Sequence, residues 1–157
     1  MTRLAITGHR GLPSETEQLV DSALREEIAN TPNLVGVSCL ADGADSLFAQ
    51  AVLDHGGKLV VIIPATRYRD GLPEEHHPVY DALIARASET VQLDHVESTS
   101  QSHMDASLVM LERADRLVAV WDGKPARGYG GTADIVDAAK DRGLPVSVIW
   151  PPGAQRD

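Results

Sequence analysis

Short apolar runs alternate along this chain with segments in which apolar residues recur at helical spacing. A run of four to eight apolar residues without regular polar alternation is typical of a strand that is buried on both faces. Five such strands are expected, or six if the more polar segment 90–96 also forms one. The runs lie at residues 4–7, 35–40, 58–64, 90–96, 117–121 and 145–150.

The segments between these runs predict helices. The best-defined helix begins where Ser14 and Glu17 have the spacing of a capping box. Its apolar residues share one face, and they are Leu19, Val20, Ala23, Leu24 and Ile28. The other helices are expected after Asp45, which is placed to cap one, over residues 79–87, over residues 104–114 and after Thr132.

Strands and helices in this order predict an α/β domain of three layers. A mostly parallel sheet of five to six strands would be covered by helices on both faces. No linker, internal repeat or low-complexity tract divides the 157 residues. We therefore expect a single domain over residues 1–150, followed by a tail at residues 151–157.

The net charge argues against one class of partner. The chain has 14 basic and 23 acidic residues and a net charge of −9. A general nucleic-acid binder needs a basic face that neutralises phosphates. Nucleic acid is therefore not an expected partner, although a small basic site for one ligand is compatible with this composition.

Cysteine content and hydropathy bear on the location of the protein. Cys39 is the only cysteine, and its place in an apolar run predicts a buried small side chain rather than a reactive thiol. The N-terminus lacks the layout of a signal peptide, and no apolar stretch approaches the ~20 residues that cross a bilayer. The sequence thus predicts a cytoplasmic protein without a membrane partner.

Three polar loops are expected to meet at one edge of the sheet. In open parallel sheets, ligands bind at the carboxyl ends of the strands, where the loops that lead into the helices gather. The three loops are Thr7–Arg10, Asp42–Asp45 and Asp122–Asp134. Because each loop follows a predicted strand, we expect them to form one binding site.

The glycine-rich loop between Trp121 and Asp134 carries the strongest signal. Glycines let a backbone approach a ligand, and the free N–H groups at a helix start favour an anion such as phosphate. The loop is neither a P-loop nor a dinucleotide fingerprint. The alternative interpretation is a turn capped by Thr132. The residues expected to hold a phosphate are Gly128, Gly130, Gly131 and Thr132.

The loop Thr7–Arg10 contributes an arginine and a histidine to the expected site. The Arg10 guanidinium suits a phosphate in forked geometry, or it is a surface arginine. His9 either donates a hydrogen bond to the same group or has a structural role. The remaining glycines that we include among the expected ligand contacts are Gly8, Gly43 and Gly123.

Carboxylates occur in the second and third loops. Asp134 either is stabilised by the helix dipole alone or contacts a ribose and assists cleavage of a glycosidic bond. Asp122 is equally well explained as a turn former or a ligand contact. Asp45 is better explained as a helix cap than as a catalytic acid, and Asp42 has the same ambiguity. We retain Asp45 and Asp122 as ligand contacts and Asp134 as the candidate catalytic residue.

His76 and His77, beside Glu74 and Glu75, raise the hypothesis of a metal site. Adjacent side chains rarely point the same way, and no second pair of ligands accompanies them at a useful spacing. A solvated loop is the preferred interpretation of residues 65–80. Neither a metal nor a resident cofactor is expected.

Several of these motifs resemble known families. Thr7–Arg10 and Ser38–Asp45 are similar to the Thr-Gly-x-Arg and Ser-Gly-x-Ala-x-Gly-Ile-Asp stretches of the DNA-processing protein A family. The segment from Ala114 to Thr132 resembles the Gly-Gly-x-Gly-Thr-x-x-Glu region of LONELY GUY-type phosphoribohydrolases and the Gly-Thr-Ala loop of nucleoside deoxyribosyltransferases. Together these motifs resemble the SLOG superfamily, and that resemblance implies a Rossmann-like nucleotide-binding domain that pairs into a homodimer.

The departures from these patterns concern catalysis. The glutamate that follows the threonine by three residues in the phosphoribohydrolases corresponds here to Ile135, and Asp134 is one residue early. Their basic Met-His-x-Arg-Lys run has its nearest equivalent in residues 102–107, which contain no arginine or lysine. The resemblance therefore implies nucleotide binding more strongly than hydrolysis.

We thus expect the chain to bind a nucleotide or a phosphorylated ribose compound. The alternative is a nucleotide N-glycosidase, phosphoribohydrolase-like or deoxyribosyltransferase-like, that acts through Asp134. A weaker alternative is binding of single-stranded DNA, which suits an acidic chain poorly.

Overall fold

The computed structural model describes residues 1–156 and contains one parallel sheet. All neighbouring strands pair in parallel, in the order β4-β3-β2-β1-β5-β6. The prediction of a mostly parallel sheet with five to six strands is confirmed, and the more polar segment is a strand. The strands are β1 (Thr2–Gly8), β2 (Leu34–Ser38), β3 (Lys58–Ala65), β4 (Glu89–His95), β5 (Arg116–Val120) and β6 (Val146–Ile149).

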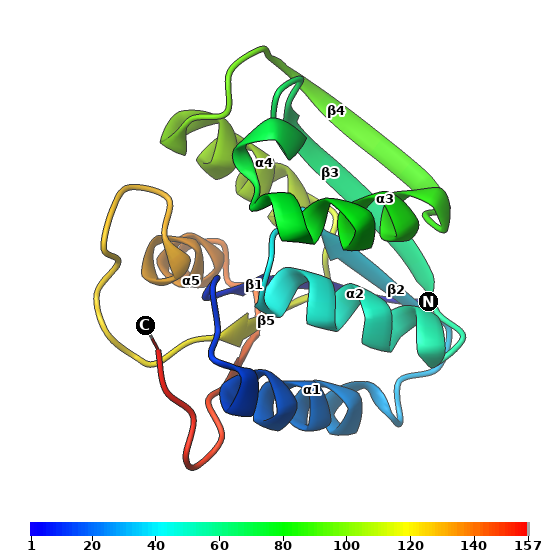
Figure 1. The fold of residues 1–157 in the computed structure, drawn as a ribbon. Helices are drawn as coiled ribbons and strands as arrows, with labels where there is room; N and C mark the ends of the chain where they lie inside the picture. The colour runs from blue at the N-terminus through cyan, green and yellow to red at the C-terminus, as the bar shows by residue number, and fades with distance from the viewer. Residues whose placement is uncertain (157) are drawn as a thin grey trace.

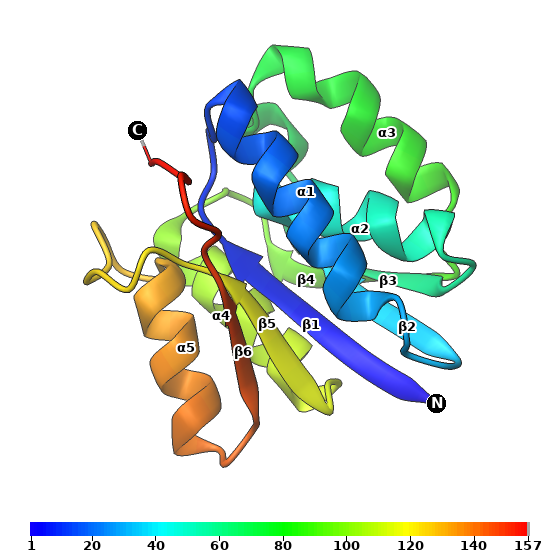
Figure 2. The ribbon, with the colours of Figure 1, turned by 90° about the horizontal axis from the view of Figure 1, so that it is seen from below.

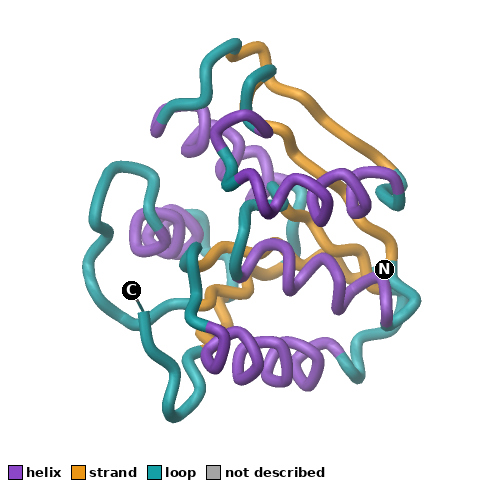
Figure 3. Tube along the Cα trace, in the orientation of Figure 1, coloured by secondary structure: helices purple, strands orange, loops and turns teal. Residues whose placement is uncertain are grey.

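Helices cover both faces of the sheet and complete the three predicted layers. Figures 1 and 2 show α1, α2 and α3 on one face and α4 and α5 on the other. Figure 3 shows how strands and helices alternate along the chain. The helices are α1 (Ser14–Ile28), α2 (Ala44–Asp54), α3 (His77–Ala85), α4 (Ser100–Glu112) and α5 (Thr132–Asp141), and two 3-10 turns, η1 (Arg69–Gly71) and η2 (Glu74–His76), precede α3.

The central strands are buried on both sides, as their unbroken apolar runs predict. Leu4 and Ile6 of β1 join one apolar cluster with Phe48 of α2. Ala5 points the other way and joins a second cluster with Met110 of α4. Alternate side chains of one strand thus enter opposite halves of the core. Within residues 1–156, no helix combines the length and the apolar character that crossing a membrane requires.

The helix starts differ from those predicted. The expected capping box at Ser14 and Glu17 is wrong, because α1 already includes Ser14 and its N-cap residue, Pro13, has no side-chain hydrogen bond. Asp45 is not a cap either, since it lies inside the first turn of α2 and the N-cap is Gly43. A capping box does occur at the start of α4, where Thr99 and Ser102 exchange hydrogen bonds.

Strand β2 is shorter than predicted because the chain turns sharply after it. Leu40, expected to end the strand, has a left-handed backbone with φ of 59°. Its carbonyl lies 3.0 Å from Nε2 of the buried His76 and accepts a hydrogen bond from Ser46 at 3.3 Å. These contacts hold the loop between β2 and α2 in place.

The strand order creates a crevice beside β1. The chain proceeds from β1 to β2, β3 and β4 on one side, and then crosses to place β5 on the other side of β1. The loops that leave β1 and β5 therefore diverge toward opposite faces of the sheet. Such a switch point is where open α/β sheets bind ligands.

Candidate functional site

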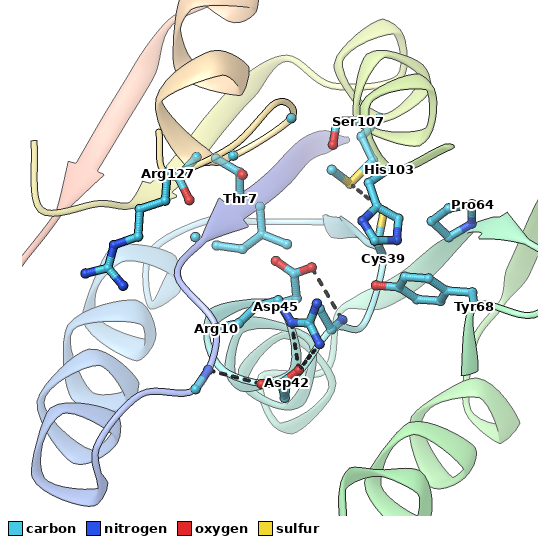
Figure 4. Close-up of a pocket in the computed structure, with 18 of the residues that line it drawn as sticks. Thr7, Arg10, Cys39, Asp42, Asp45, Pro64, Tyr68, His103, Ser107 and Arg127 are labelled. Atoms are coloured by element: carbon cyan, nitrogen blue, oxygen red, sulfur yellow. Dashed lines mark hydrogen bonds and ion pairs between the residues drawn. The ribbon is translucent and has the colours of Figure 1, made fainter. Parts of the chain in front are cut away.

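A cavity of about 470 Å³ opens at the carboxyl edge of the sheet, beside this switch point. Its walls come from all three predicted loops, from the loop after β3 and from one side of α4. Figure 4 shows these side chains around the end of β1. The volume lies within the range of small-molecule sites. The three loops therefore border one cavity, at the carboxyl edge of the sheet.

One end of the cavity is formed by the glycine-rich loop and the start of α5. Gly130, Gly131 and Thr132 line it. Gly130 has a φ of 82°, which favours glycine, and a Cβ on Gly131 would lie 2.9 Å from the Ala126 Cβ. Within residues 1–156, the backbone N–H groups of Thr132 and Ala133 have no acceptor. This end thus presents the positive end of a helix to the cavity.

Two arginines border the same end. The Arg127 side chain projects from the glycine-rich loop and is exposed. It forms no ion pair with any residue from 1 to 156. Arg156 follows β6 and also lines the cavity. Neither arginine was predicted as a site residue, because an arginine in a polar loop or near a terminus has no local signature in the sequence.

Asp134 lies outside the lining of the cavity. Its Oδ2 accepts a hydrogen bond from the Gly130 N–H at 2.9 Å, so the carboxylate closes the glycine-rich loop onto the first turn of α5. The structure therefore gives Asp134 a part in shaping the loop, and brings a different carboxylate, Asp45, into the cavity.

His9 lies beneath the site rather than in it. Its side chain is buried, and its Nε2 accepts a hydrogen bond from the Asp122 N–H at 3.0 Å. Nδ1 must then carry the proton, and it lies 3.4 Å from Thr132 Oγ1. Burial, followed by the charge of Arg156, lowers the pKa of His9. The neutral ring thus connects the ends of β1 and β5 to the start of α5.

Arg10 lines the cavity and forms an ion pair with Asp42. Its Nε donates to Asp42 Oδ1 at 2.8 Å, and a second guanidinium nitrogen lies 2.8 Å from the same oxygen. Asp42 also accepts the Gly11 N–H at 3.0 Å. Figure 4 shows Arg10 between Asp42 and Asp45. Its charge is therefore shared with carboxylates instead of being free for a phosphate.

Asp45 faces the cavity from the first turn of α2. Protein atoms surround its carboxyl closely, although the side chain keeps some exposure where the cavity opens. Burial raises the pKa of Asp45 to about 7, and the nearby Asp42 adds to this rise while the Ala41 N–H and Arg10 oppose it. A carboxyl with such a pKa holds and releases a proton near neutral pH.

The opposite end of the cavity is aromatic and largely apolar. Tyr68 and His103 line it with their rings 5.5 Å apart in an edge-to-face arrangement. Burial, and then Arg10, lowers the pKa of His103, whose Nε2 lies 2.8 Å from Ser98 Oγ. Pro64 and the buried Cys39 complete this end. Burial raises the pKa of the Cys39 thiol, in agreement with the expected inert side chain.

Two of the remaining predicted glycines allow close packing of the backbone, and the other two lie in open space. Gly8 lines the cavity, and a Cβ there would lie 2.4 Å from the Ala44 Cβ. Gly43 has a φ of 86° and would bring a Cβ within 2.6 Å of the His9 carbonyl, so it lets α2 approach β1. Gly123 and Gly128 have open space around them and do not line the cavity.

Asp122 also lies outside the cavity lining. Its Oδ1 accepts the Lys124 N–H at 3.0 Å and lies 3.3 Å from His9 Nε2. Although burial works against it, the Lys124 N–H helps to hold the pKa of Asp122 below its usual value. Asp122 is therefore an ionised turn residue at the border of the site.

The histidine pair does not lie in a solvated loop. His76 is buried against Ser46, with His76 Nε2 and Ser46 Oγ 3.1 Å apart, and His77 Nε2 lies 2.7 Å from the Arg69 carbonyl. The two rings thus brace separate turns. Nowhere in residues 1–156 do three or more metal-binding side chains come together.

No protein-family model matches this sequence, and no curated protein sequence matches it either. Solved structures do match it. DNA processing protein A from Streptococcus pneumoniae has a TM-score of 0.69 and 18% identity over 98% of this chain, which spans 52% of that protein. DNA processing protein A from Helicobacter pylori, described as binding single-stranded DNA, has a TM-score of 0.71 and 17% identity, with 98% and 68% coverage.

A third match comes from a different kind of protein. The molybdenum cofactor binding protein from Rippkaea orientalis has a TM-score of 0.61 and 13% identity, covering 94% of this chain and 75% of that protein. The chain therefore shares the fold of these proteins. This confirms the Rossmann-like fold that the resemblance to SLOG proteins implied. The chain spans about half of the Streptococcus protein, and at these identities the likeness concerns the fold alone.

Proposed function

We propose that this protein binds a nucleotide or a phosphorylated ribose compound in the cavity beside β1. The phosphate would lie on the Thr132 and Ala133 N–H groups with Arg127 beside it. The base would lie against Tyr68 and His103. The observation that carries the proposal is a single cavity with an open helix N-terminus at one end and aromatic side chains at the other.

The two ends of the cavity suit the two parts of a nucleotide. Backbone N–H groups and the dipole at a helix start favour an anion, and an unpaired guanidinium strengthens the site. An apolar end excludes water from a planar base and offers ring contacts. Proteins with this fold bind the molybdenum cofactor in one case and single-stranded DNA in another, which supports a ligand-binding use of the fold.

Calorimetric titration with a nucleotide panel tests the proposal. The panel contains adenosine and guanosine mono- and diphosphates, ribose 5-phosphate and adenosine. We expect at least one phosphorylated member to bind with micromolar affinity, and R127Q to weaken it by about tenfold. R142Q, at the exposed far end of α5, is the matched control. If every member binds more weakly than millimolar, the proposal is wrong.

A nucleotide N-glycosidase is the second candidate function. Asp45 favours it, because a carboxyl with a pKa of about 7 lies in the cavity and can serve as a general acid or base. Asp134, the catalytic residue expected from the sequence, would instead position the glycine-rich loop through its hydrogen bond with Gly130.

Chromatographic detection of free base separates binding from cleavage. Purified protein is incubated with nucleoside monophosphates, and base release is followed over time. If cleavage occurs, we expect D45N to abolish it and D134N to change mainly KM. Release of no base leaves binding as the function, and an unchanged rate in D45N would rule out Asp45.

A further inference from the structure

The segment that follows β6 returns to the site instead of leaving the domain. The Trp150 ring packs edge-to-face on His9, with centroids 5.5 Å apart. The Gln155 N–H donates to Thr16 Oγ1 at 2.9 Å, and a turn at Gly153 has a φ of 89°. Residues 150–156, which we call the strap, are therefore held against β1 and α1.

The strap places Arg156 at the glycine end of the cavity. The side chain is 21% exposed and lines the cavity, and within residues 1–156 it forms a long ion pair with Asp122 Oδ2 at 3.9 Å. This distance allows attraction but is too long for a hydrogen bond. Asp122 thus attracts the guanidinium without accepting a hydrogen bond from it.

Arg156 and Arg127 approach the same helix start from different parts of the chain. Arg127 belongs to the glycine-rich loop, and both residues line the cavity together with Gly131 and Thr132. Arg10 is paired with Asp42, which balances its charge. Among residues 1–156, the glycine end therefore holds two guanidinium groups and backbone N–H groups without an acceptor, beside the carboxylates of Asp122 and Asp134.

We propose that the strap is part of the binding site and that Arg156 makes the cavity selective for a terminal phosphate monoester or diphosphate. Two cations and a helix start match a group with two or more negative charges better than a singly charged phosphodiester. An unphosphorylated nucleoside gains nothing from them. This inference rests on the proposed function, because it names the ligand class of the same cavity.

The test compares AMP, ADP, cyclic 3′,5′-AMP and adenosine, with the matching guanosine series, on wild type, R156Q and R142Q. We expect the wild type to bind the mono- and diphosphates at least tenfold more tightly than the cyclic phosphodiester. R156Q should lose about tenfold or more in affinity for AMP and ADP while adenosine binding is unchanged. R142Q removes the same charge at the far end of α5, about 15 Å away, and should bind like the wild type.

A second variant tests the strap itself. T16V removes the hydroxyl that accepts the Gln155 N–H without touching the cavity, so it should weaken AMP binding severalfold and spare adenosine. Circular dichroism and thermal unfolding establish that each variant is folded. Equal affinity of R156Q and wild type for AMP would overturn the proposal, as would an equal loss for AMP and adenosine.

Pyrophosphate separates a failure of this inference from a failure of the proposed function. If no nucleotide binds but pyrophosphate raises the unfolding temperature of the wild type and not of R156Q, the nucleotide proposal is wrong and the anion site stands. If nucleotides bind and R156Q behaves like the wild type, only the role of Arg156 is wrong. If neither nucleotides nor pyrophosphate bind, both proposals are overturned.

Discussion

Asp45 changes its protonation state near neutral pH, and the charge of the cavity changes with it. Among residues 1–156, Asp45 has no acidic or basic partner at hydrogen-bond distance, and its shifted pKa of about 7 results mainly from burial. In the ionised form it adds a negative charge beside Asp42, and in the protonated form it becomes a hydrogen-bond donor. A ligand that accepts a hydrogen bond at this point would favour the protonated form.

This pKa predicts how stability depends on pH. Because the folded pKa lies above the unfolded value near 4, the contribution of Asp45 is fully present below pH 4 and is lost as pH rises through about 7. Between pH 5 and pH 8 the wild type should lose about 2 kcal/mol that D45N keeps. Urea unfolding of both proteins at the two pH values measures the difference.

D137N is the control for this experiment, since Asp137 is exposed on α5. It should follow the pH dependence of the wild type. A pH dependence in D45N equal to that of the wild type would show that the Asp45 carboxyl titrates at an ordinary value.

The starts of α2 and α5 show how similar elements acquire different roles. Both helices begin at the cavity after a glycine. At α2, Asp42 and Asp45 lie beside the helix start and compensate its positive end. At α5, the carboxylate of Asp134 turns back to Gly130, which leaves the first N–H groups facing the cavity. An anion is therefore expected at α5 and not at α2.

Close contact between β1 and α2 predicts the effects of glycine substitutions. G8A should lower the free energy of unfolding by about 1–3 kcal/mol, because the new Cβ would meet the Ala44 and Val120 side chains at 2.4 and 2.8 Å. G128A, with nothing within 4 Å, should change stability by less than about 0.5 kcal/mol. Chemical denaturation measures both, and a destabilisation in G128A equal to that in G8A would contradict the packing argument.

The net charge of −9 argues against nucleic acid as a partner of the whole molecule. The basic residues at the cavity are few and lie in a recess rather than on a continuous face. We expect no retention on immobilised single-stranded DNA even at 50 mM salt, because binding to a phosphate backbone needs several cations in a row. Retention that falls steeply with added salt would instead favour DNA binding.

We also expect a homodimer, as the resemblance to SLOG proteins implied. Met104 and Val109 of α4 are only half-buried, although they pack against the core. A second copy would cover them. Sedimentation analysis should give about twice the chain mass of 16.8 kDa, and M104E should shift it toward the monomer. A monomer mass at all concentrations would contradict the expectation.

The sequence by itself determined the order of elements, the parallel sheet and the edge at which the three polar loops meet. These features follow from local patterns, because apolar runs and helical periodicity reflect burial along a single segment. The inert character of Cys39 was predictable for the same reason. The starts of α1 and α2 were not, since turns at Pro13 and Gly43 replaced the expected side-chain caps.

Only the tertiary structure decided which side chains enter the cavity. His9 is drawn beneath the site by a bond to the backbone of Asp122, 113 residues away, and the strap is held by a bond that spans 139 residues. Tyr68 and Arg156 reach the cavity from segments without a recognisable motif, and His103 comes from the run 102–107, which lacks the basic residues of the family pattern. The direction of a loop side chain depends on partners that are distant in sequence, and folding alone brings those partners together.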